Sequence, residues 1–161
     1  MNDAGITSLA GGESLDKAAP AICALGSLDE LNAALGLLRA GLGGTPDAAR
    51  IEVLQRQVLL IGAELATGTA RVAPGAVAEL EQDLARRSAK LPPLHGFVLP
   101  GANELSARAH VARAACRRAE REVVRARETH PERVFPASLA WLNRLSALLF
   151  AWARTLENAP H

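Results

Sequence analysis

Aromatic side chains are scarce in this chain of 161 residues: they make up 3% of the sequence, and Tyr is absent. Strands of β-sandwiches and barrels favour aromatic and β-branched residues, so the composition argues against an all-β fold. Proteins that stack single-stranded nucleic acid also depend on aromatic platforms, and a formal net charge of +1 creates no global field for polyanions. We therefore expect no nucleic-acid partner.

Cysteine, clustered histidine and long apolar runs are also lacking. Cys23 and Cys116 lie far apart without CxxC spacing, and we interpret both as reduced, buried small residues. The four His form no HxxxH or HExxH pair, so no protein-bound metal is expected. No uninterrupted apolar run reaches 18 residues, and the first residues do not resemble a signal peptide. These features predict a cytoplasmic protein without a membrane span.

Helix-forming residues dominate what is present. Ala is about a fifth of the chain, and sixteen of the eighteen basic residues are Arg. Apolar residues recur at spacings of three and four, which indicates amphipathic helices. The predicted helices cover residues 27–42, 47–67, 74–90, 104–128 and 136–158. With short connections, they predict an all-α fold, a five-helix up-and-down bundle forming a single domain over residues 1–161.

Local signals set the expected helix starts. Ser27 and Glu30 fit an S-x-x-E capping box, so the first helix is expected to begin there and residues 1–26 to form a loop. Asp47 is expected to cap the second helix, and Pro74 fits the first turn of the third. Pro and Gly keep segment 91–101 from being helical, although it is apolar and needs something to pack against.

The fourth predicted helix carries seven arginines. Arg113 and Arg117 share a face that continues to Glu120 or Arg121, while Arg118 lies about 100° around the helix. Like charges stacked in this way face either water or an anion. From the residues alone both interpretations stay open: a solvated face paired with neighbouring Glu, or a polyphosphate cradle built from planar, bidentate donors.

Two further features are weaker signals. The Gly-rich segment 5–13 contains Thr7 and Ser8 and is followed by Lys17, and backbone amides, hydroxyls and a Lys suit phosphate. The segment is no Walker A motif, however, and taken alone it favours an ordinary flexible terminus. Asn143 is polar within an otherwise apolar last helix, where it either faces solvent or serves a ligand.

Several segments, each a weak family signature alone, become a specific one when they occur together and in this order. They are 5–13 with Lys17, 26–32, 62–66, 91–94, 97–101, 110–121 and 142–146, which include D-E-L-N (29–32), C-R-R-A-E-R (116–121) and L-N-R-L-S (142–146). In this combination the chain resembles the PduO-type ATP:cob(I)alamin adenosyltransferases over nearly its whole length. The resemblance implies a five-helix bundle that forms a homotrimer with active sites between subunits. It also implies transfer of the 5′-deoxyadenosyl group of ATP to cob(I)alamin, with release of triphosphate.

The resemblance also assigns roles to individual residues. Positions that match the ATP site are Thr7, Ser8, Lys17, Arg117, Arg118, Glu120, Arg121 and Asn143. Asp29 and Arg113 match a pair that meets across the subunit interface beside the corrin, and Phe97 matches the aromatic residue that keeps the lower axial face of cobalamin empty. Mg²⁺ is implied as the companion of ATP, and a corrinoid reductase or a cobalamin-dependent acceptor enzyme is implied as a further partner.

The N-terminal segment departs from the family pattern. The family's phosphate loop usually reads T-R-T-G-D-x-G, often with Lys at x, whereas this chain opens Met1-Asn2-Asp3-Ala4-Gly5. The T-R-T portion has no counterpart, Asn2 stands where Gly is expected, and Ala4 replaces the common Lys. Two interpretations stay open: either the start of the sequence is misassigned, or the chain is a divergent member in which weakened ATP binding is expected. The alternative function is a non-catalytic corrinoid-binding or carrier relative.

Overall fold

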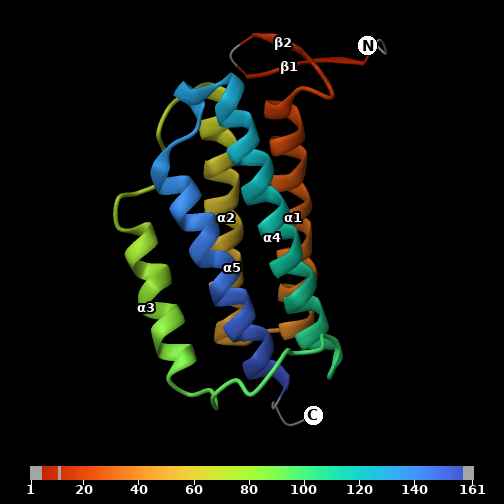
Figure 1. Ribbon diagram of the computed structural model, residues 1–161, viewed down its shortest axis with the longest axis vertical. Helices are drawn as coiled ribbons and strands as arrows, with labels where there is room; N and C mark the ends of the chain where they lie inside the picture. Colours follow the sequence, from red (N-terminus) through yellow and green to blue (C-terminus); the bar gives the residue numbers. More distant parts are fainter. Residues whose placement is uncertain (1–4, 11, 158–161) are drawn as a thin grey trace.

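A computed structural model describes residues 5–10 and 12–157. Within them, five α-helices run up and down and a short β-hairpin crosses one end of the bundle (Figure 1). The elements are β1 (Ile6–Ser8), β2 (Ser14–Asp16), α1 (Pro20–Leu42), α2 (Pro46–Thr67), α3 (Ala76–Ser88), α4 (Glu104–Thr129), the 3₁₀ turn η1 (Pro131–Arg133) and α5 (Pro136–Glu157). The all-α five-helix bundle predicted from the sequence is confirmed.

The helices pack in the order α2, α1, α4, α5, α3 around the bundle. Their predicted apolar seams are buried, and Trp141 and Trp152 of α5 are the largest fully buried side chains. The inner face of α4 is built from small buried residues: Ala109, Ala112, Ala115, Cys116 and Ala119. Side chains of this size let α1 and α5 approach α4 closely, so the long polar residues of α4 are left on its outer face.

The first helix begins seven residues earlier than its local capping signal predicts. Pro20 occupies the first turn, after Ala19 in extended conformation, and Pro is well suited to this position because its missing N–H would be unpaired there. Ser27 is buried within the helix and caps nothing, so the capping-box prediction is wrong. Glu30 therefore lies in mid-helix, where it forms an ion pair with Arg118 of α4.

The segment expected to be a loop contains a β-hairpin. Strands β1 and β2 pair antiparallel, with Thr7 opposite Leu15 and Ser8 opposite Ser14. Leu9, in the connection between the strands, is buried. Residues 1–4, which carry the departure from the family's phosphate-loop pattern, lie outside the described residues.

Asp47 does not cap the second helix. Thr45 is the N-cap residue, and its Oγ1 accepts a hydrogen bond from Ala48 N at 3.3 Å. The Asp47 carboxylate instead accepts a bond of 2.6 Å from Arg87 Nη2 and one of 2.9 Å from Trp152 Nε1. The Arg87 guanidinium lies 3.9 Å from the centroid of the Trp152 ring. One carboxylate at the start of α2 thus links α3 to α5.

The two cysteines differ in their surroundings. Cys116 is buried, as predicted, and its Sγ donates to Leu142 O at 3.2 Å. Burial, with the Glu120 carboxylate adding to it, raises the pKa of the Cys116 thiol far above its usual value, so the thiol stays protonated. Cys23 is exposed on α1, and the prediction that it is buried is wrong.

One described helix, α1, is long and apolar enough to cross a membrane by length and composition alone. Eight of its residues are buried in the bundle, where they face α2 and α4. The core helix of a bundle passes the same test, so α1 is weak evidence for a membrane span.

The link made by Asp47 can be tested by its dependence on pH. Burial opposes ionisation of Asp47, but hydrogen bonds from Arg87 and Trp152 and the Arg87 charge outweigh it and lower the pKa of the carboxyl. The stabilisation is therefore complete above the unfolded-state pKa and is lost as pH falls through the lowered folded-state pKa. We expect Asp47→Ala to reduce the free energy of unfolding at pH 7 by about 1–2 kcal/mol, measured by urea denaturation.

The control is Glu52→Ala, which removes an exposed carboxylate paired with Arg39 and Arg56. It should change the free energy of unfolding little, because solvent screens both pairs. Equal losses in the two variants, or an Asp47→Ala difference that stays constant into strong acid, would contradict the role given to Asp47.

Candidate functional site

A groove of about 660 Å³ lies where the hairpin meets the α1–α4 seam. Thr7 and Lys17 line it from the hairpin side, and Arg118 and Arg125 line it from α4. Ser27 of α1, which carries a hydroxyl group, also lines the groove. Cations and hydroxyl groups gathered in one hollow are suited to bind phosphate oxygens.

Two carboxylates share the groove with these cations. Glu30 pairs with Arg118 across the α1–α4 seam, and both side chains are about half exposed. Glu122 pairs with Arg125, with Nη1 3.0 Å from Oε2. Lys17 has no carboxylate partner among the described residues. With three cations and two anions, the lining of the groove has a net positive charge.

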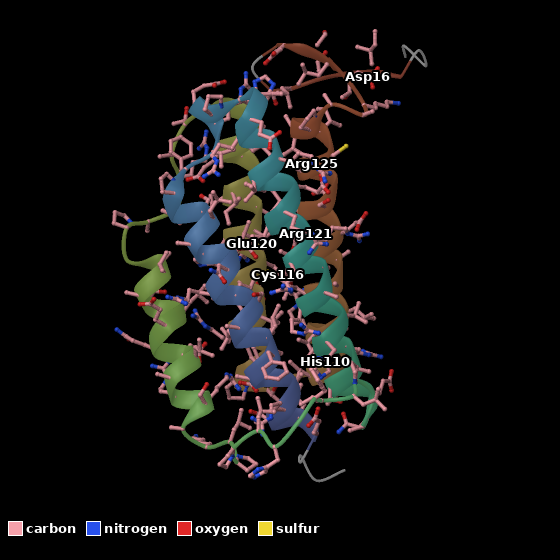
Figure 2. The ribbon with its side chains drawn as sticks, viewed as in Figure 1. Asp16, His110, Cys116, Glu120, Arg121 and Arg125 are labelled. Atoms are coloured by element: carbon pink, nitrogen blue, oxygen red, sulfur yellow. The ribbon has the colours of Figure 1, made fainter. Side chains whose placement is uncertain are left out.

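Arg118, Glu122 and Arg125 occupy one face of α4 because they lie at i, i+4 and i+7. Arg118 is among the site residues expected from the sequence, whereas Glu122 and Arg125 are not. The spacing alone could have found both of them. In Figure 2, Arg125 is the labelled α4 residue nearest the hairpin, and His110 is at the opposite end of the helix.

Of the eight residues expected at the ATP site, the single chain brings three into this groove: Thr7, Lys17 and Arg118. The other five do not line it: Ser8, Arg117, Glu120, Arg121 and Asn143. Arg117 and Arg121 are exposed on the outer face of α4. Asn143 is exposed on α5, and Ser8 bonds with Ser14 at 3.2 Å within the hairpin. One chain therefore brings three of the eight expected residues into the groove and leaves the other five outside it.

Asp29 and Arg113 lie on different sides of the bundle. Asp29 is exposed beside a hollow between α1 and α2 that Val58 and Gly62 help to line. Arg113 is half-buried on α4, with its Cζ 5.9 Å from the centroid of the Phe150 ring of α5. Its Nε is buried without a hydrogen-bond partner among the described residues. No ion pair joins Asp29 to Arg113 within the described part of this chain.

Phe97 stands fully exposed in the connection between α3 and α4, with a relative accessibility of 109%. Leu94 and Leu99 of the same connection are also exposed. The expectation that this apolar loop packs against the bundle therefore holds only in part: residues 91–94 line a hollow of about 380 Å³ together with Phe150 of α5. The tip of the loop presents bare apolar surface of the kind that a ligand or partner covers.

Comparison with known proteins identifies the family. Residues 1–156 match the model of the cobalamin adenosyltransferase family. The chain is 37% identical to the corrinoid adenosyltransferase PduO of Salmonella typhimurium over 99% of its own length and 49% of that protein. It is 39% identical to the cobalamin adenosyltransferase of Cupriavidus metallidurans, over 98% of this chain and 85% of that one. The chain belongs to the cobalamin adenosyltransferase family, and it spans about half the length of the Salmonella relative.

Solved structures agree with this assignment. A variant PduO-type ATP:corrinoid adenosyltransferase from Lactobacillus reuteri, complexed with cobalamin and ATP, superimposes with a TM-score of 0.88 at 29% identity. The match covers 96% of this chain and 90% of that one. Another variant of the same type and organism, complexed with ATP, gives a TM-score of 0.84 at the same identity and covers 96% and 90% of the two chains. The family resemblance seen in the sequence motifs is thereby confirmed.

The groove predicts binding of a free polyphosphate. Inorganic tripolyphosphate should bind at low ionic strength, and Arg118→Ala should weaken it by about tenfold, because a charge-assisted contact is lost. Isothermal titration calorimetry measures the affinity. Arg127→Ala is the matched control, since it removes an exposed Arg of the same helix that does not line the groove. Equal weakening by both variants would show that only overall charge matters.

Proposed function

We propose that this chain transfers the 5′-deoxyadenosyl group of ATP to cob(I)alamin, forming adenosylcobalamin and triphosphate. The observation that carries the proposal is the cationic groove of Thr7, Lys17 and Arg118 in a fold shared with structures that hold ATP and cobalamin. The family model matches residues 1–156 of this chain, and we propose that residues 1–161 act as one adenosyltransferase domain.

The transfer step demands little acid–base chemistry from the protein. Cobalt(I) supplies an electron pair to the ribose 5′-carbon, the cobalt–carbon bond forms, and the C5′–O bond breaks with its electrons leaving on triphosphate. The protein contributes position and neutralisation of charge, because triphosphate is a highly charged leaving group. Lys17 and Arg118 suit that task in the groove, and Arg117, Arg121, Glu120, Ser8 and Asn143 join them at the nucleotide in this proposal. The thiol of Cys116, protonated and buried, is not needed.

Mg²⁺ would accompany the nucleotide in this proposal. The described residues contain no cluster of three or more His, Cys, Asp or Glu side chains that could hold a metal ion. Mg²⁺ commonly binds through substrate phosphates and one or two carboxylates rather than an all-protein cage. Glu30 and Glu122, which line the groove, are the carboxylates placed to take part.

We further propose a homotrimer with the active site between subunits. The unpartnered Nε of Arg113 and the distance of Asp29 from it within one chain support this arrangement. A head-to-tail contact that places Asp29 of one copy beside Arg113 of the next uses two different surfaces on each chain, and such contacts form a ring when the rotation between copies closes. The same contact would bring the residues that lie outside the groove close to a neighbour's nucleotide.

In the same proposal Phe97 covers the lower axial face of the corrin. A fully exposed aromatic side chain in a Pro- and Gly-bounded loop has its whole apolar surface free for such contact. The enzyme is proposed to act in the cytoplasm, receiving reduced corrinoid from a reductase and passing product to a cobalamin-dependent enzyme.

The function is tested by an anaerobic assay with reduced cobalamin, ATP and Mg²⁺, in which absorbance follows formation of the cobalt–carbon bond. Formation of adenosylcobalamin with stoichiometric triphosphate supports the proposal. Tight cobalamin binding without ATP binding or turnover would instead establish the non-catalytic carrier, for which the departure at residues 1–4 is the motivating observation.

The shared site predicts complementation between two inactive variants. Asp29→Asn and Arg113→Ala should each impair corrinoid handling more than ATP binding. When the two variants are unfolded, mixed and refolded, about a quarter of the interfaces regain both native side chains, and that share of activity should return. A pair formed within one chain would give no recovery.

Phe97→Ala should slow adenosyl transfer by on the order of 10- to 100-fold while leaving ATP affinity and thermal stability near those of the native protein. The side chain makes no contribution to the core, so its loss should let water or the lower base reach cobalt. Spectra of bound cob(II)alamin should then lose the four-coordinate signature. Leu99→Ala is the control, because it removes an exposed apolar side chain from the same loop. Native-like spectra and rates for Phe97→Ala would reject the role.

A further inference from the structure

The hairpin that carries Thr7 and Lys17 is held to the bundle by few contacts. Among the described residues of segment 5–19, only Leu9 is buried. Among residues 5–10 and 12–157, one side-chain hydrogen bond joins the segment 5–19 to an element other than α1, and that bond runs from Arg133 to Glu13. The position of one wall of the groove therefore depends on this contact.

Arg133 contacts three groups through its three guanidinium nitrogens. Nη2 donates to Glu13 Oε2 at 2.7 Å, at the turn that precedes β2. Nη1 donates to Ala66 O at 3.1 Å, in the last turn of α2, and Nε lies 3.4 Å from Glu132 Oε1. The Arg133 side chain is 15% exposed and that of Glu13 is 38% exposed, so the contact is partly shielded from solvent on the Arg133 side.

Arg133 also sits at a fixed place relative to the other wall of the groove. It belongs to η1, which follows α4 directly, and α4 supplies Arg118 and Arg125 to that wall. A rigid guanidinium that holds α2 and Glu13 together sets the hairpin's distance from both helices. Arg is suited to this because its planar fork fixes direction as well as charge.

We propose that Arg133 is a positioning residue of the nucleotide site: through Glu13 it holds the hairpin so that Thr7 and Lys17 face Arg118 across the groove. The inference rests on the proposed function, since it assigns the arrangement to ATP binding. Arg133 itself does not line the groove, so it acts through Glu13 rather than by touching the nucleotide.

The test compares two matched variants of the full chain. Glu13→Gln removes the charge that Arg133 holds on the hairpin and leaves the bond from Arg133 to Ala66 in place. Glu132→Gln removes the other carboxylate beside the same guanidinium, at the exposed end of η1, and does not touch the hairpin. ATP affinity is measured by calorimetry without corrinoid, and amide hydrogen exchange is followed in the hairpin and in α4.

Glu13→Gln is expected to raise the Kd for ATP by about 3- to 10-fold and to speed exchange of the amides of Leu9 and Gly12, which bond within the hairpin turn. Exchange in α4 and the melting temperature should stay unchanged. Glu132→Gln should leave ATP affinity and hairpin exchange as in the native protein. Arg133→Gln should reproduce the effect of Glu13→Gln on affinity, and the double variant should show no further loss.

Three results would overturn the inference. If Glu13→Gln speeds hairpin exchange but ATP affinity is unchanged, Arg133 anchors the hairpin without positioning the site, and the proposed function stands. If neither exchange nor affinity changes, the contact does not position the hairpin. If the native chain binds no ATP at all, the proposed function fails, and the positioning role fails with it, whatever the exchange data show about anchoring.

Discussion

Close packing along the inner face of α4 is the constraint on which the rest of the arrangement depends. Ala112, Cys116 and Ala119 are small enough to let α1 and α5 approach on both sides, and the space they leave is filled by the Leu seams and the two Trp of α5. A larger side chain in this row would push a neighbouring helix outward. Because the inner face is closed in this way, every Arg of α4 is directed to the rim or to the outer surface.

The outer part of α4 is consequently divided between two neighbours. Arg118 and Arg125 meet α1 and the hairpin, whereas Arg113 meets Phe150 of α5. A single rigid helix thus presents one set of cations to a groove and a separate cation toward a different face. The helix itself fixes the distance between the two sets.

The sequence predicted the features that follow from periodicity, and it failed where distant contacts decide. Leu31, Leu35 and Ile51 are buried as their three–four spacing indicates. Local capping rules gave the wrong role to Ser27 and Asp47, because a Pro seven residues upstream starts α1 and because Arg87, 40 residues away, takes the Asp47 carboxylate. The hairpin was missed since its strands have three residues each, too few for an alternating pattern. Family motifs supplied Thr7 and Lys17, while the partners Glu13 and Arg133, 120 residues apart, carry no local signal.

The two carboxylates in the groove compete with any anion for its arginines. Glu30 and Glu122 pair with Arg118 and Arg125, so an anion that binds either arginine competes with a carboxylate, whereas Lys17 has no carboxylate partner among the described residues. A chloride ion or a single phosphate gains one contact for each one that it displaces. A chain of linked phosphates that reached both arginines would compete with both carboxylates as one molecule, so an arrangement of this kind favours several linked charges over the same charges on separate ions.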